Sequence, residues 1–371
     1  MFNKNWKALI LSIAILIITT VASGETSQIA IPQLQQSQPI SRSQPDPNQL
    51  RPRRRMSREE MLKQQDPNYS PDAYGIHDPV MIKQGDYYYV FSTNGGIKIT
   101  RSKDMKNFER IGQVFTKLPD WMPEHIRGIN SLWAPDISFR NGLYHLYYSA
   151  SSFGTRNSLI GLMVNKTLDP ASPDYKWIDK GIVTKSSEGM SYNAIDPNLI
   201  KDQSGQWYMS FGSFWTGIKL IRIGDNGLEL DNTVKPIDLA ERDSHAVEAP
   251  FIISRNGYYY LFVSFDLCCR GANSTYKIMV GRAKNIIGPY LDKDGIPMTD
   301  GGGSLILAAG ETDRWKGPGH NAIFSENNHD YLIYHAYDSN ISFGPSALHI
   351  RDLLWDKDKW PYPGEEINLQ P

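Results

Sequence analysis

The stretch "DPVMIKQGDYYYVFST" (residues 78–93) has the pattern of a β-hairpin. An apolar run follows an Asp-Pro pair, a Gly-Asp turn comes next, and a tyrosine-rich run forms the second strand. Short apolar runs and Gly, Asn and Asp turns continue down the chain, and helical periodicity is hard to find. We therefore predict an all-β domain over residues 71–371.

Four later segments repeat this pattern. They are "APDISFRNGLYHLYYSA" (134–150), "DPNLIKDQSGQWYMSFGS" (196–213), "EAPFIISRNGYYYLFVSF" (248–265) and "HNAIFSENNHDYLIYHAY" (320–337). Their leading polar residues stand at positions 78, 136, 196, 248 and 320, at intervals of 52 to 72 residues. An all-β array with this period fits a propeller with about four strands per blade. A β-sandwich does not explain such regular spacing. We predict a β-propeller built from these five units.

The composition is that of a soluble globular protein. Hydrophobic residues make up 40% of the chain and charged residues 21%, which is enough for a substantial core. Lys+Arg 39 against Asp+Glu 40 gives a formal net charge of −1, so no global field would attract nucleic acid. The Tyr 20, Trp 9 and Phe 13 are mostly core in this interpretation, but exposed rings of this kind suit sugar-binding clefts.

The first residues have the features of an export signal. Lys4 and Lys7 precede the apolar run 8–22, which ends at small residues, Ala22-Ser23-Gly24. This run is short for a membrane span, which needs about 20 apolar residues, so an uncleaved anchor is the less favoured interpretation. We predict a signal peptide over residues 1–24, a secreted or periplasmic protein, and no stable membrane association after cleavage.

Residues 25–70 are poor in large apolar side chains and rich in Gln, Ser, Pro and Arg. Such a segment buries too little apolar surface to offset its ordering entropy, so we predict a disordered linker. Its basic run "RPRRR" (51–55) could touch acidic polymers or lipid headgroups, although a solvated linker is the simpler interpretation.

Cys268 and Cys269 are the only cysteines, and they are adjacent. They provide neither a disulfide framework nor a cysteine metal site. Because a disulfide between neighbouring residues closes a strained eight-membered ring, two reduced and largely buried thiols are the favoured prediction.

The first strand of each propeller blade lines the central channel, so the leading residues should converge there. This places Asp78, Asp196, Glu248 and His320 in one cleft, although each Asp-Pro taken alone could be a turn. Asp136 starts from a different place on its strand and is the weakest of the four acids. Carboxyl groups that face one cleft suit glycoside hydrolysis, in which one acts as acid and another activates water or attacks the sugar. A third carboxylate would raise the pKa of the acid by repulsion.

The chain from about residue 71 resembles the family 43 glycoside hydrolases, specifically the endo-acting arabinan hydrolases. The pair "FGSFW" (211–215) and "LCCRG" (267–271) is far more specific than an isolated Asp-Pro. The matching segments, in family order, are "HDPVMIKQGDYYYVFST" (77–93), "LWAPDI" (132–137), "SSFGTRNSLIGL" (151–162), "NAIDPNLI" (193–200), "FGSFWTGIKL" (211–220), "VEAPFII" (247–253), "LCCRGANSTYKIMVGR" (267–282), "GPYLDKDG" (288–295), "GGGSLIL" (301–307) and "GHNAIF" (319–324).

This resemblance implies a five-bladed propeller and inverting, single-displacement hydrolysis. It implies that Asp78 is the general base and Glu248 the general acid, and that Asp196 tunes the pKa of its neighbour and orients it. It also implies that His320 associates with a central ion, often calcium. Since calcium prefers oxygen ligands, most of the shell of such an ion would be water. The alternative is that His320 only tunes the acids through hydrogen bonds.

The resemblance also points to substrate-binding residues. Trp133 and Phe153 match sugar-stacking platforms, and Gly154 would permit close approach. The other matching positions are Asn193, Ala194 and Ile195 beside Asp196, and Ser213, Phe214 and Trp215. The cysteine pair would wall the cleft. The alternative for each ring is core packing.

The expected function is endo-hydrolysis of α-1,5-linked arabinan by a monomer. An exo-acting arabinofuranosidase or β-xylosidase of the same fold is the first alternative. No appended sandwich follows the fifth unit to close the cleft, which favours endo action. A fructan-acting propeller would be expected to carry an Arg-Asp-Pro motif, which does not occur here. Non-catalytic carbohydrate-binding and protein-binding propellers are further alternatives, but neither requires converging acids.

Overall fold

The computed structural model describes residues 60, 74–243, 245–367 and 369. The predicted signal peptide and nearly all of the predicted linker lie outside these residues. Within the described ranges, no helix is long and apolar enough to cross a membrane.

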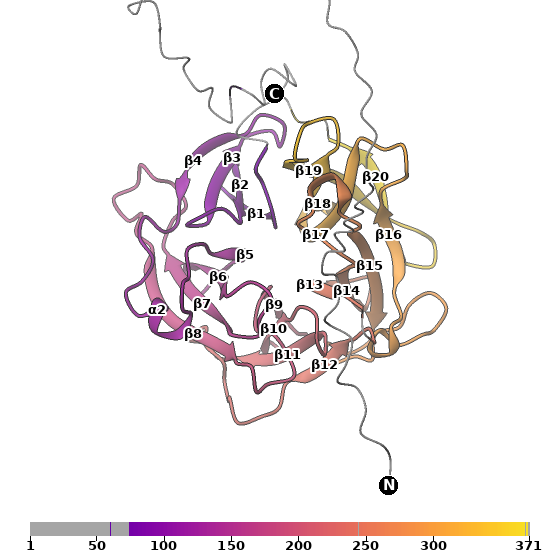
Figure 1. Cartoon of the computed structure of the whole chain (residues 1–371), viewed down its shortest axis with the longest axis horizontal. Coiled ribbons are helices and arrows are strands. Elements are labelled where there is room, and N and C mark those ends of the chain that lie inside the picture. Colours follow the sequence, from indigo (N-terminus) through magenta and orange to yellow (C-terminus); the bar gives the residue numbers. More distant parts are fainter. Residues whose placement is uncertain (1–59, 61–73, 244, 368, 370–371) are drawn as a thin grey trace, which may run out of the picture. The chain divides into compact units, whose positions relative to one another are not determined.

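Five four-stranded antiparallel sheets surround a central axis as the blades of a propeller, which confirms the predicted fold (Figure 1). Blades 1 and 2 contain β1 (Val80–Gln84), β2 (Tyr87–Ser92), β3 (Lys98–Ser102), β4 (Glu109–Gln113), β5 (Trp133–Arg140), β6 (Leu143–Ser151), β7 (Ser158–Asn165) and β8 (Ile178–Ser186). Blade 3 contains β9 (Asn198–Lys201), β10 (Trp207–Phe211), β11 (Ile218–Ile223) and β12 (Ile237–Ala240). Blades 4 and 5 contain β13 (Val247–Arg255), β14 (Tyr258–Phe265), β15 (Lys277–Ala283), β16 (Ser304–Ala308), β17 (Trp315–Glu326), β18 (His329–Asp338), β19 (Ser346–Trp355) and β20 (Pro361–Glu366).

The five hairpins expected from the sequence are the first two strands of the five blades. Their second strands lie inside the sheets and are apolar along most of their length, as in β6, where eight of nine residues are buried. Continuous burial replaces in-out alternation because a neighbouring blade covers each face. One interblade core, for example, combines Ile160 and Leu162 of β7 with Met209 and Phe211 of β10.

The ring closes through the start of the described chain. Tyr74 forms a β-bridge with Ala347 of β19, and the backbone N–H of Gly75 donates to the carbonyl oxygen of Ser346 at 2.8 Å. The hydroxyl of Tyr74 also donates to Oδ2 of Asp338 at 2.7 Å. Blade 1 is therefore tied to blade 5 only a few residues before Asp78.

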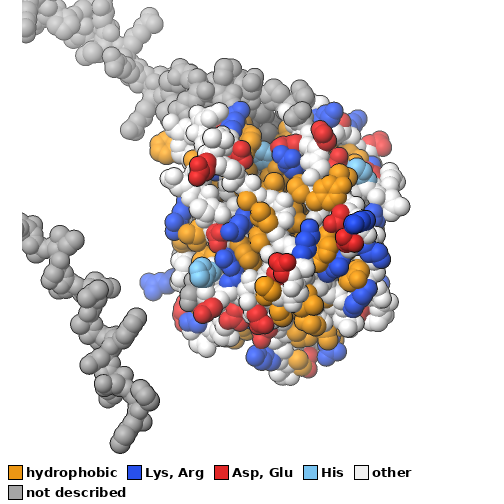
Figure 2. All heavy atoms as spheres, turned by 90° about the vertical axis from the view of Figure 1, so that its right-hand side faces the viewer, with side chains coloured by type: hydrophobic (Ala, Val, Ile, Leu, Met, Phe, Trp, Pro, Cys, Tyr) orange, Lys and Arg blue, Asp and Glu red, His pale blue; other side chains and the backbone are white. Residues whose placement is uncertain are grey.

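The regular helical elements in the described ranges beyond residue 74 are short: α2 (Met122–His125), η1 (Gly271–Asn273) and η2 (Met298–Asp300). On the flank that Figure 2 shows, acidic, basic and apolar side chains are interspersed, in agreement with the near-zero net charge.

Candidate active site

Near the start of the first strand of each blade lies one residue with an unusual backbone conformation. Each of these residues stands two positions before the point where the continuous pairing of the first hairpin of its blade begins, and each has a positive φ. Except at glycine, this conformation costs roughly 1–2 kcal/mol, which tertiary contacts must offset. The residues are Asp78 (51°), Ala134 (45°), Asp196 (60°), Ala249 (54°) and His320 (47°).

The preceding blade holds the backbone N–H of four of these residues. The acceptors are side chains at one equivalent position near the end of the second strand. These N–H groups belong to Asp78 (to Nδ1 of His335, 3.1 Å), Ala134 (to Oγ1 of Thr93, 2.7 Å), Asp196 (to Oγ of Ser149, 2.9 Å) and His320 (to Oγ of Ser264, 2.8 Å).

Blade 3 has Gly212 at this equivalent position, where a Cβ would lie 2.3 Å from the carbonyl oxygen of Gly217. No side chain fits there, and the carboxylate of Asp196 accepts the N–H of Ala249 instead, at 3.1 Å.

This register corrects two of the predicted leading residues. Ala134, and not Asp136, leads blade 2. Asp136 lies two residues further on, where its Oδ2 accepts the N–H of Leu199 at 2.8 Å, and it does not line the central cavity. Glu248 stands one residue before the leading position of blade 4, and its longer side chain still reaches the cavity.

A cavity of about 790 Å³ lies at the leading residues and brings Asp78, Asp196, Glu248 and His320 together. The walls also contain the predicted Trp133, Phe153, Gly154, Asn193, Ile195, Ser213, Phe214 and Trp215. The four polar groups come from blades 1, 3, 4 and 5. The convergence expected from propeller geometry is therefore present.

Asp78 is buried and accepts hydrogen bonds on both carboxylate oxygens. Oδ1 lies 2.7 Å from Nδ1 of His77 and 3.0 Å from Nδ1 of His320, and Oδ2 accepts the hydroxyl of Thr93 at 2.5 Å. Burial by itself would raise the pKa of Asp78, but His320 and His77 outweigh it and hold this pKa well below its usual value. Asp78 is therefore ionised across the physiological range.

The pKa values of Asp196 and His320 are raised, in contrast to that of Asp78. Burial, reinforced by the charges of Glu248 and Asp78, raises the pKa of Asp196 to about 8, against a lowering by His320. Burial would lower the pKa of His320, but Asp78, Asp196 and Glu248 outweigh it and raise this pKa to about 9. Near neutral pH, a protonated Asp196 and an imidazolium relieve the repulsion among the three carboxyl groups.

Glu248 is held by two hydroxyl groups. Ser213 donates to Oε2 at 2.5 Å, and Tyr276 donates to Oε1. Burial, followed by the charges of Glu248 and Asp196, raises the pKa of Tyr276 well above its usual value, so Tyr276 keeps its proton. The carboxyl group is thus fixed in orientation at the cavity wall.

Two pairs of aromatic rings, one from blade 2 and one from blade 3, form part of the wall. Phe153 is 83% exposed and lies edge-on to Trp133, with ring centroids 6.4 Å apart. Phe214 and Trp215 have centroids 6.5 Å apart, and both have a positive φ. Gly154 has a φ of 77°, and a Cβ there would meet no protein atom within 4 Å. Its conformation rather than close packing accounts for the glycine.

Two predicted residues bordering Asp196 have mainly internal contacts. Asn193 is buried at the cavity, where its Oδ1 accepts the hydroxyl of Ser158 at 2.6 Å. Ala194 is fully buried in the core between blades 2 and 3 and does not line the cavity.

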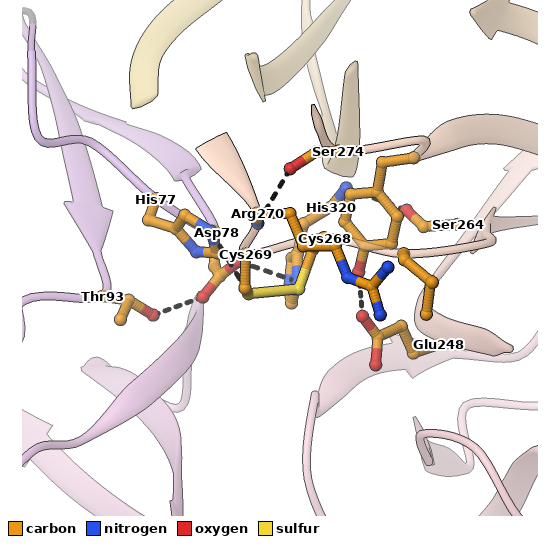
Figure 3. Close-up of a disulfide and its surroundings, with 12 residues drawn as sticks. His77, Asp78, Thr93, Glu248, Ser264, Cys268, Cys269, Arg270, Ser274 and His320 are labelled. Carbon is orange, nitrogen blue, oxygen red and sulfur yellow. Dashed lines mark hydrogen bonds and ion pairs between the residues drawn. A yellow bond between two sulfur atoms is a disulfide. The ribbon is translucent and has the colours of Figure 1, made fainter. Parts of the chain in front are cut away.

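The favoured prediction for the cysteines is wrong. Cys268 and Cys269 form a disulfide, Cys268 is half-buried and Cys269 is exposed. Their loop lies at the mouth of the cavity rather than in a core, and both residues line the cavity as expected (Figure 3). Figure 3 also shows the disulfide beside His77 and Asp78, and Sγ of Cys269 lies 3.9 Å from Nε2 of His77.

The residues around His320 suit a cation in charge but supply few oxygen ligands. Three carboxyl groups act on its ring, and both polar atoms of the adjacent buried Asn321 side chain lack a hydrogen-bond partner. Nδ1 of His320 is paired with Asp78, so only its second nitrogen could bind an ion, with water as most of the shell.

His77, Asp78 and His335 also offer ligand atoms within 4.8 Å of one another. However, Nδ1 of His335 accepts the N–H of Asp78, and both nitrogens of His77 have partners. This group is therefore satisfied without a metal.

Sequence reasoning missed Thr93, Ser213's bond to Glu248, and Tyr276. Thr93 had a signal, because it occupies the same hairpin register as Ser149, Ser264 and His335. Tyr276 had none, since it lies in a loop whose conformation depends on blade 5.

Comparisons with known proteins show the family of the chain. Residues 73–361 match the model of "Glycosyl hydrolases family 43". The chain is 44% identical over 307 residues to an extracellular exo-alpha-(1->5)-L-arabinofuranosidase of Cellvibrio japonicus, covering 78% of this chain and 87% of that protein. It is 43% identical over 291 residues to an extracellular endo-alpha-(1->5)-L-arabinanase of Bacillus subtilis, covering 77% and 87%.

Among solved structures, the alpha-L-arabinanase of Cellvibrio cellulosa complexed with arabinohexaose superposes with a TM-score of 0.75 at 43% identity, covering 78% of this chain and 96% of that one. The family model, the sequence relatives and the fold agree on one family. The chain belongs to glycosyl hydrolases family 43.

Proposed function

We propose that the protein is a secreted endo-1,5-α-L-arabinanase that cleaves arabinan by inverting, single-displacement hydrolysis. The observation that carries this proposal is the convergence of Asp78, Asp196 and Glu248 in one cavity with aromatic walls. Relatives named as arabinanases and arabinofuranosidases supply the substrate class. The extracellular relatives and the export signal expected at residues 1–24 support secretion, and we propose that the enzyme acts as a monomer without stable membrane association.

Asp78 is the proposed general base. Its three hydrogen-bond donors leave one acceptor position on Oδ2, beside the bond from Thr93, for a proton of the attacking water. A carboxylate that stays ionised at all physiological pH values can take this proton without first losing one of its own.

Glu248 is the proposed general acid. It must carry a proton toward the leaving oxygen, and its protonated oxygen can still accept a hydrogen bond, so the bonds from Ser213 and Tyr276 can persist while the proton faces the substrate. Asp196 accepts the N–H of Ala249, the residue after Glu248, and thereby positions the backbone of the acid.

Endo action is supported by a second cavity beside the first. A cavity of about 460 Å³ shares Phe214, Trp215 and Leu267 with the central cavity and continues away from it. A polymer bound across the central cavity could continue into this space, whereas an exo-acting enzyme needs one end blocked. The 44%-identical exo-acting relative keeps an exo-arabinofuranosidase as the second candidate.

A proposed calcium ion would bind beside His320, and this imidazole and the nearby carboxylates would hold it together with water. Such an ion would supply positive charge at the propeller centre. A proton on the second nitrogen of His320 would compete with it.

Product analysis on linear and debranched arabinan, beside xylan, tests the proposal. We expect oligosaccharides from arabinan, viscosity that falls faster than reducing ends appear, and the inverted β-anomer as the first product by NMR. Release of monosaccharide alone would favour the exo-acting candidate. First formation of the α-anomer would contradict inversion.

A further inference from the structure

A hydrogen-bonded group lies behind Asp78, on the side of blade 5, and the proposed mechanism uses only the bond from its His77 to Asp78. It contains His77, His335 and Tyr337, and it ends at the loop of the disulfide. The rings of His77 and His335 are stacked, with centroids 3.8 Å apart. The hydrogen-bond partners of these three side chains determine where their ring and hydroxyl hydrogens lie.

His335 fixes the first proton. Its Nδ1 accepts the backbone N–H of Asp78 at 3.1 Å, so this nitrogen carries no hydrogen. The hydrogen of the neutral ring is therefore on Nε2, which lies 3.3 Å from the hydroxyl oxygen of Tyr337. His335 can only donate to Tyr337.

Tyr337 receives further hydrogen bonds and has one to give. Its oxygen accepts the backbone N–H of Cys269 at 2.9 Å, and together with the N–H of His335 this bond uses both of its acceptor positions. The nearest acceptor for its own proton is Nε2 of His77, at 2.7 Å. The Tyr337 hydroxyl therefore donates to His77.

The bond from Tyr337 determines which nitrogen of His77 faces the carboxylate of Asp78. Because its Nε2 accepts from Tyr337, its hydrogen is on Nδ1, which lies 2.7 Å from Oδ1 of Asp78. Without Tyr337 the other tautomer becomes available, and it would turn a lone pair toward the carboxylate.

We propose that Tyr337 is a positioning residue for the base: it fixes the tautomer and orientation of His77 against Asp78 and ties both to the loop of Cys268 and Cys269. This inference rests on the proposed role of Asp78. It goes beyond that role because Tyr337 does not line the cavity.

The test compares Tyr337→Phe with Tyr334→Phe. Tyr334 is also buried on β18, but its hydroxyl bonds to Nε of Arg351 at 2.9 Å and not to this group. On linear arabinan we expect Tyr337→Phe to lower kcat about 10- to 100-fold, part of what a general base contributes, with KM within about twofold. Tyr334→Phe should keep kcat within about twofold of wild type. Wild-type kcat in Tyr337→Phe, or equal losses in both variants, would overturn the inference.

A double-mutant cycle separates positioning from structural support. If Tyr337 acts through His77, then Tyr337→Phe added to His77→Ala should lower kcat by less than about twofold. An undiminished further loss would show that Tyr337 acts independently of His77. Near-UV circular dichroism compares the folded state of all variants.

Failure of the proposed function gives a different result. A wild-type enzyme inactive on arabinan would overturn the proposed substrate alone. The same variants would then be compared on whichever glycoside the wild type cleaves, with the same expected ratios.

Discussion

Asp78 and Asp196 occupy equivalent places in blades 1 and 3, and their carboxyl groups nevertheless differ in charge. Both follow the same register, both precede proline, and both have a positive φ. Both are buried as well. Yet the pKa of Asp78 lies well below its usual value, whereas that of Asp196 is raised to about 8.

The difference comes from the neighbours that each blade supplies. Asp78 is paired with the imidazoles of His320 and His77, which lower its pKa, whereas Asp196 follows the apolar Ile195 and faces the charges of Glu248 and Asp78, which raise its pKa. A repeated backbone thus delivers the same functional group twice, and the adjacent residues make one copy a base and the other a proton holder.

The largest effect should follow from Asp78→Asn. The amide cannot take a proton from water, so we expect kcat on arabinan to fall about 10³-fold, within the usual range for a general base. Asp136→Asn is the matched control, because Asp136 is also buried but lies outside the cavity, and it should keep wild-type kcat. Retained activity in Asp78→Asn would remove Asp78 from the role of base.

Asp196→Asn should have a smaller effect, a loss of about 10- to 100-fold in kcat. Near neutral pH the native carboxyl group is largely protonated, and asparagine resembles that form while keeping an acceptor for Ala249. Steady-state kinetics at pH 6–7 provide the comparison. If the loss equals that of Asp78→Asn, the two aspartates do not differ as their neighbours suggest.

Reduction of the disulfide should have a still smaller effect. Opening it frees the loop whose Cys269 N–H donates to Tyr337, and one such hydrogen bond corresponds to a loss of about 2- to 10-fold. Activity is measured with and without a reductant, after thiol titration. The Cys268→Ser/Cys269→Ser variant is the control and should not respond to the reductant. An identical response in both would assign the loss to something other than the disulfide.

Asp136 should affect stability and not turnover. Burial raises its pKa to about 7, above the value near 4 of an unfolded chain, so its contribution is complete below pH 4 and is lost as the pH rises to 7. Relative to Asp136→Asn, wild type should lose up to about 4 kcal/mol of unfolding free energy over this range, at about 1.4 kcal/mol per pKa unit. Urea unfolding at several pH values measures it. If wild type instead gained unfolding free energy relative to Asp136→Asn as the pH rises, the sign would be wrong.

The sequence could predict the five units and the convergence of their leading residues, because hairpin patterns are local and the propeller brings their ends together. The sequence-based register of blade 2 was wrong, because Asp136 beside Pro135 resembles the Asp-Pro pairs of blades 1 and 3, whereas the leading residue is Ala134. The roles of Tyr276 and Tyr337 could not be predicted, because they depend on contacts between blades. Tyr337 lies on a strand that looks like ordinary buried sheet, and nothing local indicates that its hydroxyl faces His77.

The bridge between Tyr74 and β19 has a consequence for the timing of activity. It joins opposite ends of the described chain, so it belongs to the slowest class of contacts to form during folding. The contacts of Asp78 with His320 and His335 can form only when blades 1 and 5 meet. A chain with five formed sheets but an open ring would therefore have most of its native secondary structure and no assembled base. Recovery of activity after denaturation should lag behind recovery of the β-sheet signal.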